Sequence, residues 1–260
     1  MKRTFTLRVA FICAACVMAA VWGQTEDYAA LVKLLKETSV DARIQRGEEF
    51  LSKYQQSPYL ANVYSQLVSD YTQKNNMDKV VEIGERARLL KDASVLTSLA
   101  NAYNEKKDSV KTVETAQAAI EVLTGSKPQN VSDEQWAALK KILPSVNQYL
   151  IGTAYYRQAK TKPDEKTALL NKAKESLEAA VQSNPKNDFA YYQLGLTLAE
   201  MSQGTVACEA LAKAVVLEGP AKPYAQQDLE KIYMHYNRKP KAAAARDLDK
   251  LLAKAKADLK

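Results

Sequence analysis

Residues 188–220 read DFAYYQLGLTLAEMSQGTVACEALAKAVVLEGP, and this stretch decides the fold. It contains two apolar runs with a period near 3.6 residues and ends at Gly219-Pro220. Its large apolar residues are Tyr191, Leu194, Leu198 and Leu211, and its small ones are Gly195, Ala207 and Ala214. Two helices can approach closely only where the facing side chains are small. The stretch therefore predicts two antiparallel helices that cross at Gly195.

The same pattern recurs upstream in the chain. Ala173, Leu177, Ala180 and Pro185 are followed 34 residues later by Ala207, Leu211, Ala214 and Gly219, with Pro220 one place further. The two units begin at residues 145 and 188. Gly152 and Ala173 are nine residues further apart than Gly195 and Ala207, and Pro163 lies in the excess. A proline early in a helix marks its start, so the second helix of this unit is predicted to be longer by roughly two turns.

This pattern resembles the tetratricopeptide repeat. In that family a helix A and a helix B carry large residues at places 4, 7, 11 and 24 and small ones at 8, 20 and 27. Weaker matches, from starts at 61 and 93, are Tyr64, Leu67, Tyr71, Ala87, Leu96, Leu99, Ala100, Tyr103, Ala116 and Ala119. Val80 and Gly84 depart from the pattern. The resemblance implies an all-α, right-handed α-solenoid of about four to six antiparallel helix pairs.

The repeats are predicted to occupy residues 24–236, with weak repeats over 26–124, a loop over 125–134 and strong repeats over 145–220. The first helix A is expected at residues 26–38. Ser132 is a candidate N-cap for the helix after the loop, and Pro144 is expected to bend or break that helix. Residues 237–260 are predicted to form a basic amphipathic capping helix. The alternative is that residues 238–260 contact a membrane surface or an acidic partner.

Residues 1–23 are predicted to be a signal peptide. Three positive charges in the first eight residues precede fourteen uncharged ones, Val9 to Trp22. This length fits a signal-peptide apolar region of about 7–15 residues better than a membrane span of about 20. Cleavage is expected after Gly23, with an uncleaved anchor as the alternative. Loss of the leader lowers the formal charge from +7 to +4.

The predicted location of the protein follows from this leader. Export to a bacterial periplasm or cell envelope is expected, with an extracellular location as the other option. The junction from Tyr54 to Tyr59 resembles the repeat junctions of cell-envelope members of the family.

The composition restricts the chemistry that the chain can perform. One His and three Cys cannot build a zinc cluster or a multi-disulfide scaffold, and no phosphate-cradling glycine motif occurs. No metal and no cofactor are therefore predicted. A Ser-His-Asp or Cys-His site would have to use His235, whereas Cys208 lies in a different repeat and is expected to pack in the core. An enzyme is not expected, and neither is a nucleic-acid partner for an exported chain without a basic-aromatic motif.

The candidate binding surface is the concave face of the A helices, at places 2, 5, 9 and 12 of each unit. The first two units carry uncharged polar residues there: Asn62, Ser65, Ser69, Thr72, Ser94, Thr97, Asn101 and Asn104. The last two carry Val146, Tyr149, Thr153, Tyr156, Phe189, Tyr192, Leu196 and Ala199. Tyr149, Tyr156, Phe189 and Tyr192 are the candidate ligand-binding residues, because aromatic side chains contribute large contact areas. The alternative is that some of them pack against neighbouring helices.

These observations predict an exported scaffold that binds a protein or peptide through its A helices and performs no catalysis. The alternative is a membrane-surface component of a bacterial outer-membrane or cell-wall assembly machine. One subset of the family binds C-terminal carboxylates through a Lys and an Asn at places 5 and 9. Thr97 and Asn101 occupy these places here, so that clamp is incomplete and its ligand is not carried over.

Overall fold

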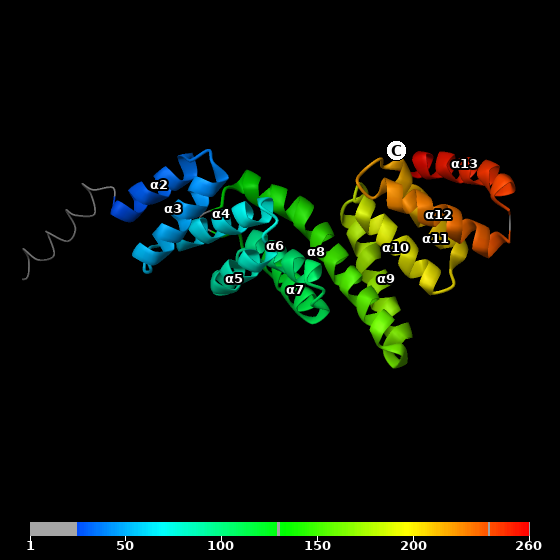
Figure 1. Ribbon diagram of the computed structural model, residues 1–260, viewed down its shortest axis with the longest axis horizontal. Coiled ribbons are helices and arrows are strands. Elements are labelled where there is room, and N and C mark those ends of the chain that lie inside the picture. The colour runs from blue at the N-terminus through cyan, green and yellow to red at the C-terminus, as the bar shows by residue number, and fades with distance from the viewer. Residues whose placement is uncertain (1–24, 129–130, 239, 260) are drawn as a thin grey trace, which may run out of the picture. The chain divides into compact units, whose positions relative to one another are not determined.

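The computed structural model describes residues 25–128, 131–238 and 240–259. Within these ranges every regular element is helical (Figure 1). The helices are α2 (Glu26–Lys36), α3 (Val40–Lys53), α4 (Leu60–Gln73), α5 (Met77–Ala87), α6 (Ala93–Glu105), α7 (Ser109–Thr124), α8 (Asp133–Thr161), α9 (Lys166–Ser183), α10 (Asp188–Glu200), α11 (Gly204–Val216), α12 (Lys222–Asn237) and α13 (Lys241–Asp258). Two short 3₁₀ helices, η1 (Arg88–Leu90) and η2 (Pro163–Glu165), lie between them. The predicted signal peptide lies outside the described residues.

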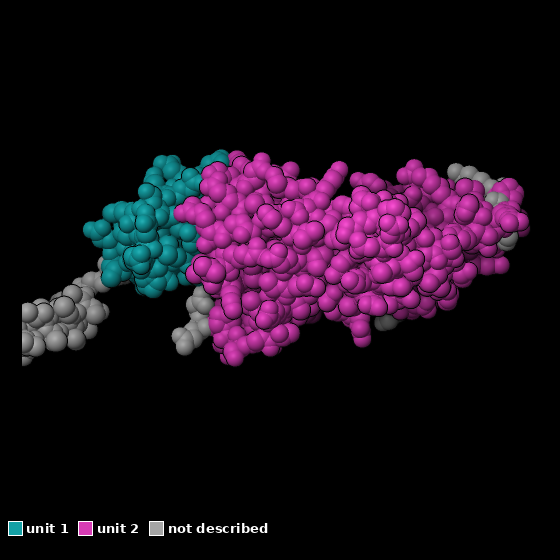
Figure 2. Space-filling view, turned by 90° about the horizontal axis from the view of Figure 1, so that it is seen from below, with its two compact units in different colours: residues 1–70 teal, residues 71–260 magenta. Residues whose placement is uncertain are grey.

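The described helices follow one another as six consecutive pairs, the upper end of the predicted range. This arrangement confirms the all-α solenoid class. The chain divides into two compact units, Met1–Asp70 and Tyr71–Lys260 (Figure 2). Helix α4 spans the division.

The first unit is built around the pair α2 and α3. Leu34 and Phe50 are almost completely buried, which contributes about 1.5–3 kcal/mol per side chain. Gly47 of α3 lies against Leu67 of α4, so closely that a Cβ atom at Gly47 would be 2.7 Å from Cδ2 of Leu67. Only glycine permits this approach of α3 and α4.

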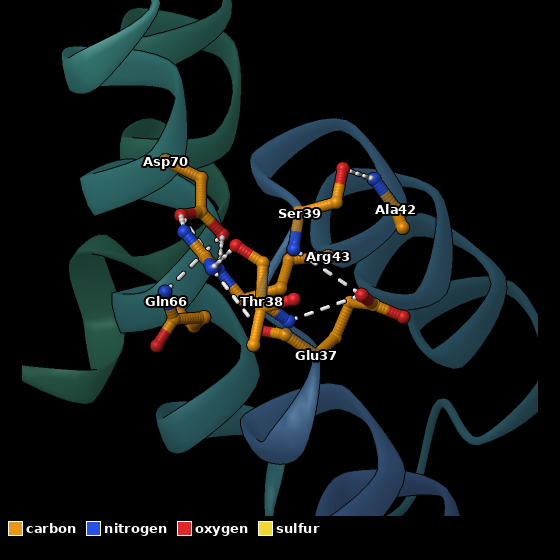
Figure 3. Close-up of polar contacts among 7 residues, drawn as sticks. All are labelled: Glu37, Thr38, Ser39, Ala42, Arg43, Gln66 and Asp70. Carbon is orange, nitrogen blue, oxygen red and sulfur yellow. Dashed lines mark hydrogen bonds and ion pairs between the residues drawn. The ribbon is translucent and has the colours of Figure 1, made fainter.

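A buried ion pair joins α3 to α4 in the same unit (Figure 3). Arg43 donates from Nη2 to Oδ1 of Asp70 at 2.6 Å, and its Nε lies 3.0 and 3.1 Å from the two carboxylate oxygens. Gln66 donates to Asp70 Oδ2 at 3.2 Å, and Arg43 Nη1 donates to the carbonyls of Glu37 and Thr38 at 3.1 Å. Because Asp70 is only 1% exposed, these bonds replace the water that it loses on folding.

In the second unit, glycine lies at the crossing of two helix pairs, as predicted. A Cβ atom at Gly152 of α8 would lie 2.5 Å from Cγ of Leu177 in α9. A Cβ atom at Gly195 of α10 would lie at the same distance from Cγ of Leu211 in α11. Both leucines are fully buried, so neither can move aside into solvent.

Gly84, which departs from the repeat pattern, has a different neighbour. A Cβ atom at this position would lie 3.1 Å from Cδ1 of Leu99 in α6. The glycine of α5 therefore brings a B helix close to the following A helix, whereas Gly152 and Gly195 bring the two helices of one pair together. The sequence pattern treats this residue as a mismatch because it compares places within one unit only.

Helix α8 is longer than predicted in both directions. Ser132 caps it through a capping box with Gln135, and the helix continues through Pro144 without a break. The nine extra residues of this unit lengthen both of its helices, not only the second one as predicted. Helix α8 extends to Thr161, and α9 has 18 residues where α11 has 13. Pro163 occupies the first turn of η2, a position where its missing N–H group leaves no helix hydrogen bond unmade, and the turn between α8 and α9 forms there.

Four of the turns between paired helices use a residue in the left-handed region. Asn75, Lys107, Ser202 and Arg238 have φ values of 55°, 61°, 62° and 50°. The turn between α8 and α9 contains η2 instead. These turns are a structural signature of the repeat that the apolar pattern does not include.

The last helix, α13, packs its apolar stripe against α11 and against α12, its own partner. Leu248, Leu251, Leu252 and Leu259 contact a core formed by α11 and α12, and Ala255 is buried within it. Lys254 forms an ion pair with Glu209 at 2.7 Å, and Tyr233 donates to Asp247 at 3.0 Å. The apolar face of α13 is therefore covered by protein.

Candidate functional site

Four aromatic side chains form a row across α8, α10 and α12. Tyr149 and Phe189 have ring centroids 6.2 Å apart, and those of Tyr192 and Tyr224 are 6.3 Å apart. Phe189 and Tyr192 are one turn apart on α10, so this helix contributes a ring to each pair. We call these four residues the aromatic row. Figure 1 shows the three helices in sequence order within the second unit.

Each pair in the row combines a recessed ring with an exposed one. Tyr149 and Tyr192 are half-buried, and burial raises the pKa of both phenols. Phe189 is 37% exposed and Tyr224 is 58% exposed. Tyr192 is also fixed by a hydrogen bond of 2.9 Å that its hydroxyl donates to Oδ2 of Asp228. The row thus presents two exposed rings beside two that are held in place.

Of the four predicted residues, the structure places Tyr149, Phe189 and Tyr192 in the aromatic row and Tyr156 beside it. Burial and the hydrogen bond to Asp228 raise the pKa of Tyr192 most, and the phenol of Tyr156 adds a smaller contribution. Lys160 lies over the Tyr156 ring, 5.1 Å from its centroid. Tyr156 also packs on a small cluster formed by Ala159, Leu169, Leu170, Tyr155 and Met201. Part of the Tyr156 side chain therefore packs against neighbouring helices, which was the alternative given for these aromatic residues.

Tyr224 was missed by the sequence reasoning. It lies near the start of α12, which follows the break at Gly219-Pro220. A further unit starting at residue 222, 34 residues after the start at 188, would have indicated an A helix here. Places 2, 5, 9 and 12 of that unit are Pro223, Gln226, Glu230 and Tyr233, so the repeat pattern does not indicate Tyr224 itself.

Charged groups on the helices of the row include Asp228 of α12, which accepts from Tyr192, and Arg157 of α8. Arg157 is half-buried, and burial lowers the pKa of its guanidinium. Its Nη2 donates to Oδ1 of Asn104 at 3.0 Å, and its Nη1 lies 3.5 Å from Oγ of Ser109. Both acceptors are neutral, and within the described ranges this guanidinium forms no ion pair. Burial raises the pKa of Tyr149 most, the charges of Glu105 and Asp188 also raise it, and the charge of Arg157 lowers it.

The polar half of the predicted groove is only partly available. Thr97 and Asn104 were expected to face the groove, but they are 7% and 8% exposed. Asn147 of α8 donates to Thr97 Oγ1 at 2.8 Å, and Arg157 bonds to Asn104. The prediction was wrong for these two residues because α8 packs closely along α6 and covers them. Asn101 remains half-buried.

The residues considered for catalysis lie apart from the row. Cys208 is 3% exposed in the core of α11, as predicted, and burial raises its pKa to about 11. His235 lies edge-on to the ring of Tyr236, with centroids 5.2 Å apart. In the part of the chain that the structure describes, no group of three or more His, Cys, Asp or Glu side chains could hold a metal ion.

The helix pairs, their glycine crossings and their left-handed turns define a solenoid of tetratricopeptide type. Neither a protein-family model nor a curated protein sequence matches the chain. Among solved structures, the chain resembles TTC0263, a thermophilic TPR protein of Thermus thermophilus. The TM-score is 0.52 at 19% identity, over 75% of this chain and 98% of that one. The chain therefore has the tetratricopeptide fold.

A second solved structure aligns more loosely. It is the TPR2AB domain of yeast Sti1 in a complex with pHSP90, with 15% identity over 89% of this chain and 97% of that one. Its TM-score is 0.29.

Proposed function

We propose that this protein is a non-catalytic scaffold that holds an extended segment of another protein on its aromatic row. The observation that supports this function is the exposure of Phe189 and Tyr224 beside recessed tyrosines. Aromatic rings in such positions are typical of binding hot spots, because they bury a large area and lose little rotamer freedom. Three successive A helices contribute to the row, so a segment that crosses them contacts every ring.

The proposed setting is the cell envelope, after export and removal of residues 1–23. The cationic and then uncharged start of the sequence supports export. A fusion of the first 23 residues to a reporter that is active only outside the cytoplasm tests this point. An active reporter supports export, and an inactive one contradicts it, with the same reporter behind residues 25–47 as the control.

Fewer observations support the alternative function, a membrane-surface component of an assembly machine. The apolar stripe of α13, which suggested a lipid contact, packs on α11 and α12. Among the described residues, no helix has both the length and the apolar character needed to cross a membrane. The exposed basic side chains of α13, including Arg246 and Lys250, still favour a contact with an anionic membrane surface.

Site-specific photo-crosslinking tests the scaffold function. A photoreactive amino acid replaces Tyr224 in one variant and Val110, a 69% exposed residue of α7, in another. In envelope extracts, the Tyr224 position should crosslink to a defined partner, and the Val110 position should not. Adding the substitution Phe189→Ala should remove the crosslink while leaving helicity unchanged. Equal crosslinking at both positions would contradict the proposal.

Substitution of the recessed rings gives a second test. Tyr192→Ala and Tyr156→Ala should each lower capture of that same partner, since Tyr192 belongs to the row and Tyr156 lies on α8, two turns after Tyr149. Tyr192→Phe is the matched control, because it keeps the ring and loses only the hydrogen bond to Asp228. Capture that survives both alanine substitutions would show that the partner binds elsewhere.

A further inference from the structure

Two leucines lie at the surface in the link between α5 and α6. Leu89 and Leu90 belong to η1 and are 92% and 43% exposed. Among the described residues, no large apolar side chain is more exposed than Leu89. Asp92 closes the link at the start of α6, because it accepts hydrogen bonds of 2.8 and 3.0 Å from the backbone N–H groups of Ser94 and Val95. The capped link holds Leu89 outside the core.

A cavity of about 380 Å³ lies between this link and α7. Leu96 of α6 and Ala118 and Val122 of α7 form the apolar part of its lining. Leu96 is only 2% exposed, so the core holds this part of the lining in place. Leu89 also lines the cavity, and its exposure places it at the open edge. A single exposed leucine is ordinary, but an exposed leucine beside an apolar hollow is typical of an interaction site.

Two exposed side chains of opposite charge also line the cavity, Lys91 and Glu121. The other charged residue of the lining, Arg88, is already paired with Glu85 at 2.9 Å and with Glu114 at 2.7 Å. In the parts of the chain that the structure describes, neither Lys91 nor Glu121 forms an ion pair. Both charges can therefore pair with charges of another chain at the edge of the cavity.

We call the surface around this cavity the Leu89 surface, and it comprises Leu89, Lys91, Ala118, Glu121 and Val122. In a dimer with two-fold symmetry, each contact from residue i to residue j of the other copy is repeated from j to i. The Leu89 surface meets this condition, because it carries both an exposed apolar side chain and an apolar hollow, and both a cation and an anion. A partner with charges of one sign would place a like charge beside Lys91 or Glu121. The charges therefore favour a second copy of this chain as the occupant.

We propose that two copies of this protein associate through the Leu89 surface as a two-fold symmetric dimer. Leu89 of each copy enters the cavity of the other, and Lys91 of each copy pairs with Glu121 of the other. This dimer is independent of the proposed scaffold function, because its surface belongs to η1, α6 and α7 and the aromatic row belongs to α8, α10 and α12. The dimer carries two aromatic rows, so it holds a ligand with two binding segments more tightly than one chain does.

Analytical ultracentrifugation of the whole protein tests the dimer. The wild type should dimerise as its concentration rises, and Leu89→Asp should raise the dissociation constant at least about a hundredfold, because two-fold symmetry counts each lost contact twice. Leu35→Asp is the matched control and should behave as the wild type, since Leu35 is 52% exposed on α2 and does not line the cavity. A wild type that stays monomeric up to about 100 μM, or an equal effect of both substitutions, would overturn the inference.

An exchange of charges tests the pairing between copies. Lys91→Glu and Glu121→Lys should each weaken self-association at least about tenfold, because each homodimer then sets like charges opposite each other twice. A mixture of the two variants should form heterodimers about as strongly as the wild type, since every contact then joins a lysine to a glutamate. Fluorescence energy transfer between the two labelled variants measures the mixed pair. A mixture that associates no more tightly than either variant alone would overturn the pairing.

The outcome for the dimer can be told apart from the outcome for the scaffold. The crosslink at Tyr224 should persist in Leu89→Asp, because the two surfaces lie on different helices. If that crosslink is found but the wild type is monomeric, the scaffold function stands and this inference fails.

Discussion

Gly195 has room for hydrogen and nothing larger on its Cα atom. A methyl group there would lie 2.5 Å from Leu211 Cγ and 3.1 Å from the carbonyl oxygen of Ala207. Gly195→Ala should therefore lower the free energy of unfolding by about 1–3 kcal/mol, although alanine favours the helix. Urea denaturation of the variant and the wild type measures the difference. Gly125→Ala is the control, since the nearest atom there is 3.4 Å away; an equal loss in both would contradict the crossing argument.

Cys208 should make the stability of the protein fall at alkaline pH. Burial, and then the charge of Glu209, raise its pKa from 9.0 to about 11 in the folded state. Because the folded pKa is raised, the stabilisation is complete below pH 9 and is lost as the pH rises towards 11, by about 2 kcal/mol. Cys208→Ala should show a shallower decline between pH 9 and 11. Identical slopes would show that the thiol ionises normally in the fold.

Glycine substitutions test the backbone strain in the left-handed turns between helices. Lys107 adopts φ 61° between α6 and α7, and Ser202 adopts φ 62° between α10 and α11. A side chain is strained in this region and glycine is not, so Lys107→Gly or Ser202→Gly should raise the free energy of unfolding by up to about 1 kcal/mol. Lys107→Ala, which keeps a Cβ atom, should stay close to the wild type. Thermal unfolding followed by circular dichroism measures all three variants.

Helix α13 provides a matched pair of positions for a test of its packing. Leu252 contacts the core of α11 and α12, whereas the adjacent Ala253 is exposed. Leu252→Asp should cost about 1–3 kcal/mol, because it places a carboxylate against an apolar surface. Ala253→Asp adds the same charge with little effect. A similar loss in both variants would mean that α13 does not depend on its apolar stripe for docking.

The sequence predicted helix contacts best where both residues of a contact belong to the same repeat. The glycines at 152 and 195 and their leucine neighbours were found because both partners belong to the same repeat. Gly84 was treated as a mismatch because its partner, Leu99, belongs to the next unit. The length of α8 was also underestimated. Proline is unfavourable in a helix interior, but the tertiary packing of α8 outweighs that local cost at Pro144.

The candidate site could be predicted in part, because some of its residues occupy fixed places within one repeat. Places 2 and 5 of the unit at 188 gave Phe189 and Tyr192, which contact neighbouring rings in the structure. Whether a polar residue on an A helix stays exposed depends on how closely the next A helix approaches. Thr97 and Asn104 are covered because Asn147 and Arg157 bond to them, and no pattern within one repeat contains that information.

At the scale of the whole molecule, the two compact units should differ in stability. The first unit has a small core, and the second contains most of the helix pairs. Small cores bury a smaller fraction of their surface and open more easily. Native-state hydrogen exchange should therefore be at least about tenfold faster for the core amides of α3 than for those of α10 and α11. Uniform protection along the chain would show a single cooperative unit instead.

The placement of the glycines limits how this gene could be rearranged. Gly47 and Gly84 serve contacts between one pair and the next, whereas Gly152 and Gly195 serve contacts inside a pair. Early and late repeats are therefore not interchangeable modules. Replacing the unit at 61 with a copy of the unit at 188 would put Leu211 in the place of Gly84, where a single Cβ atom would already lie 3.1 Å from Cδ1 of Leu99. Chimeras that exchange repeats should preserve each glycine together with its leucine.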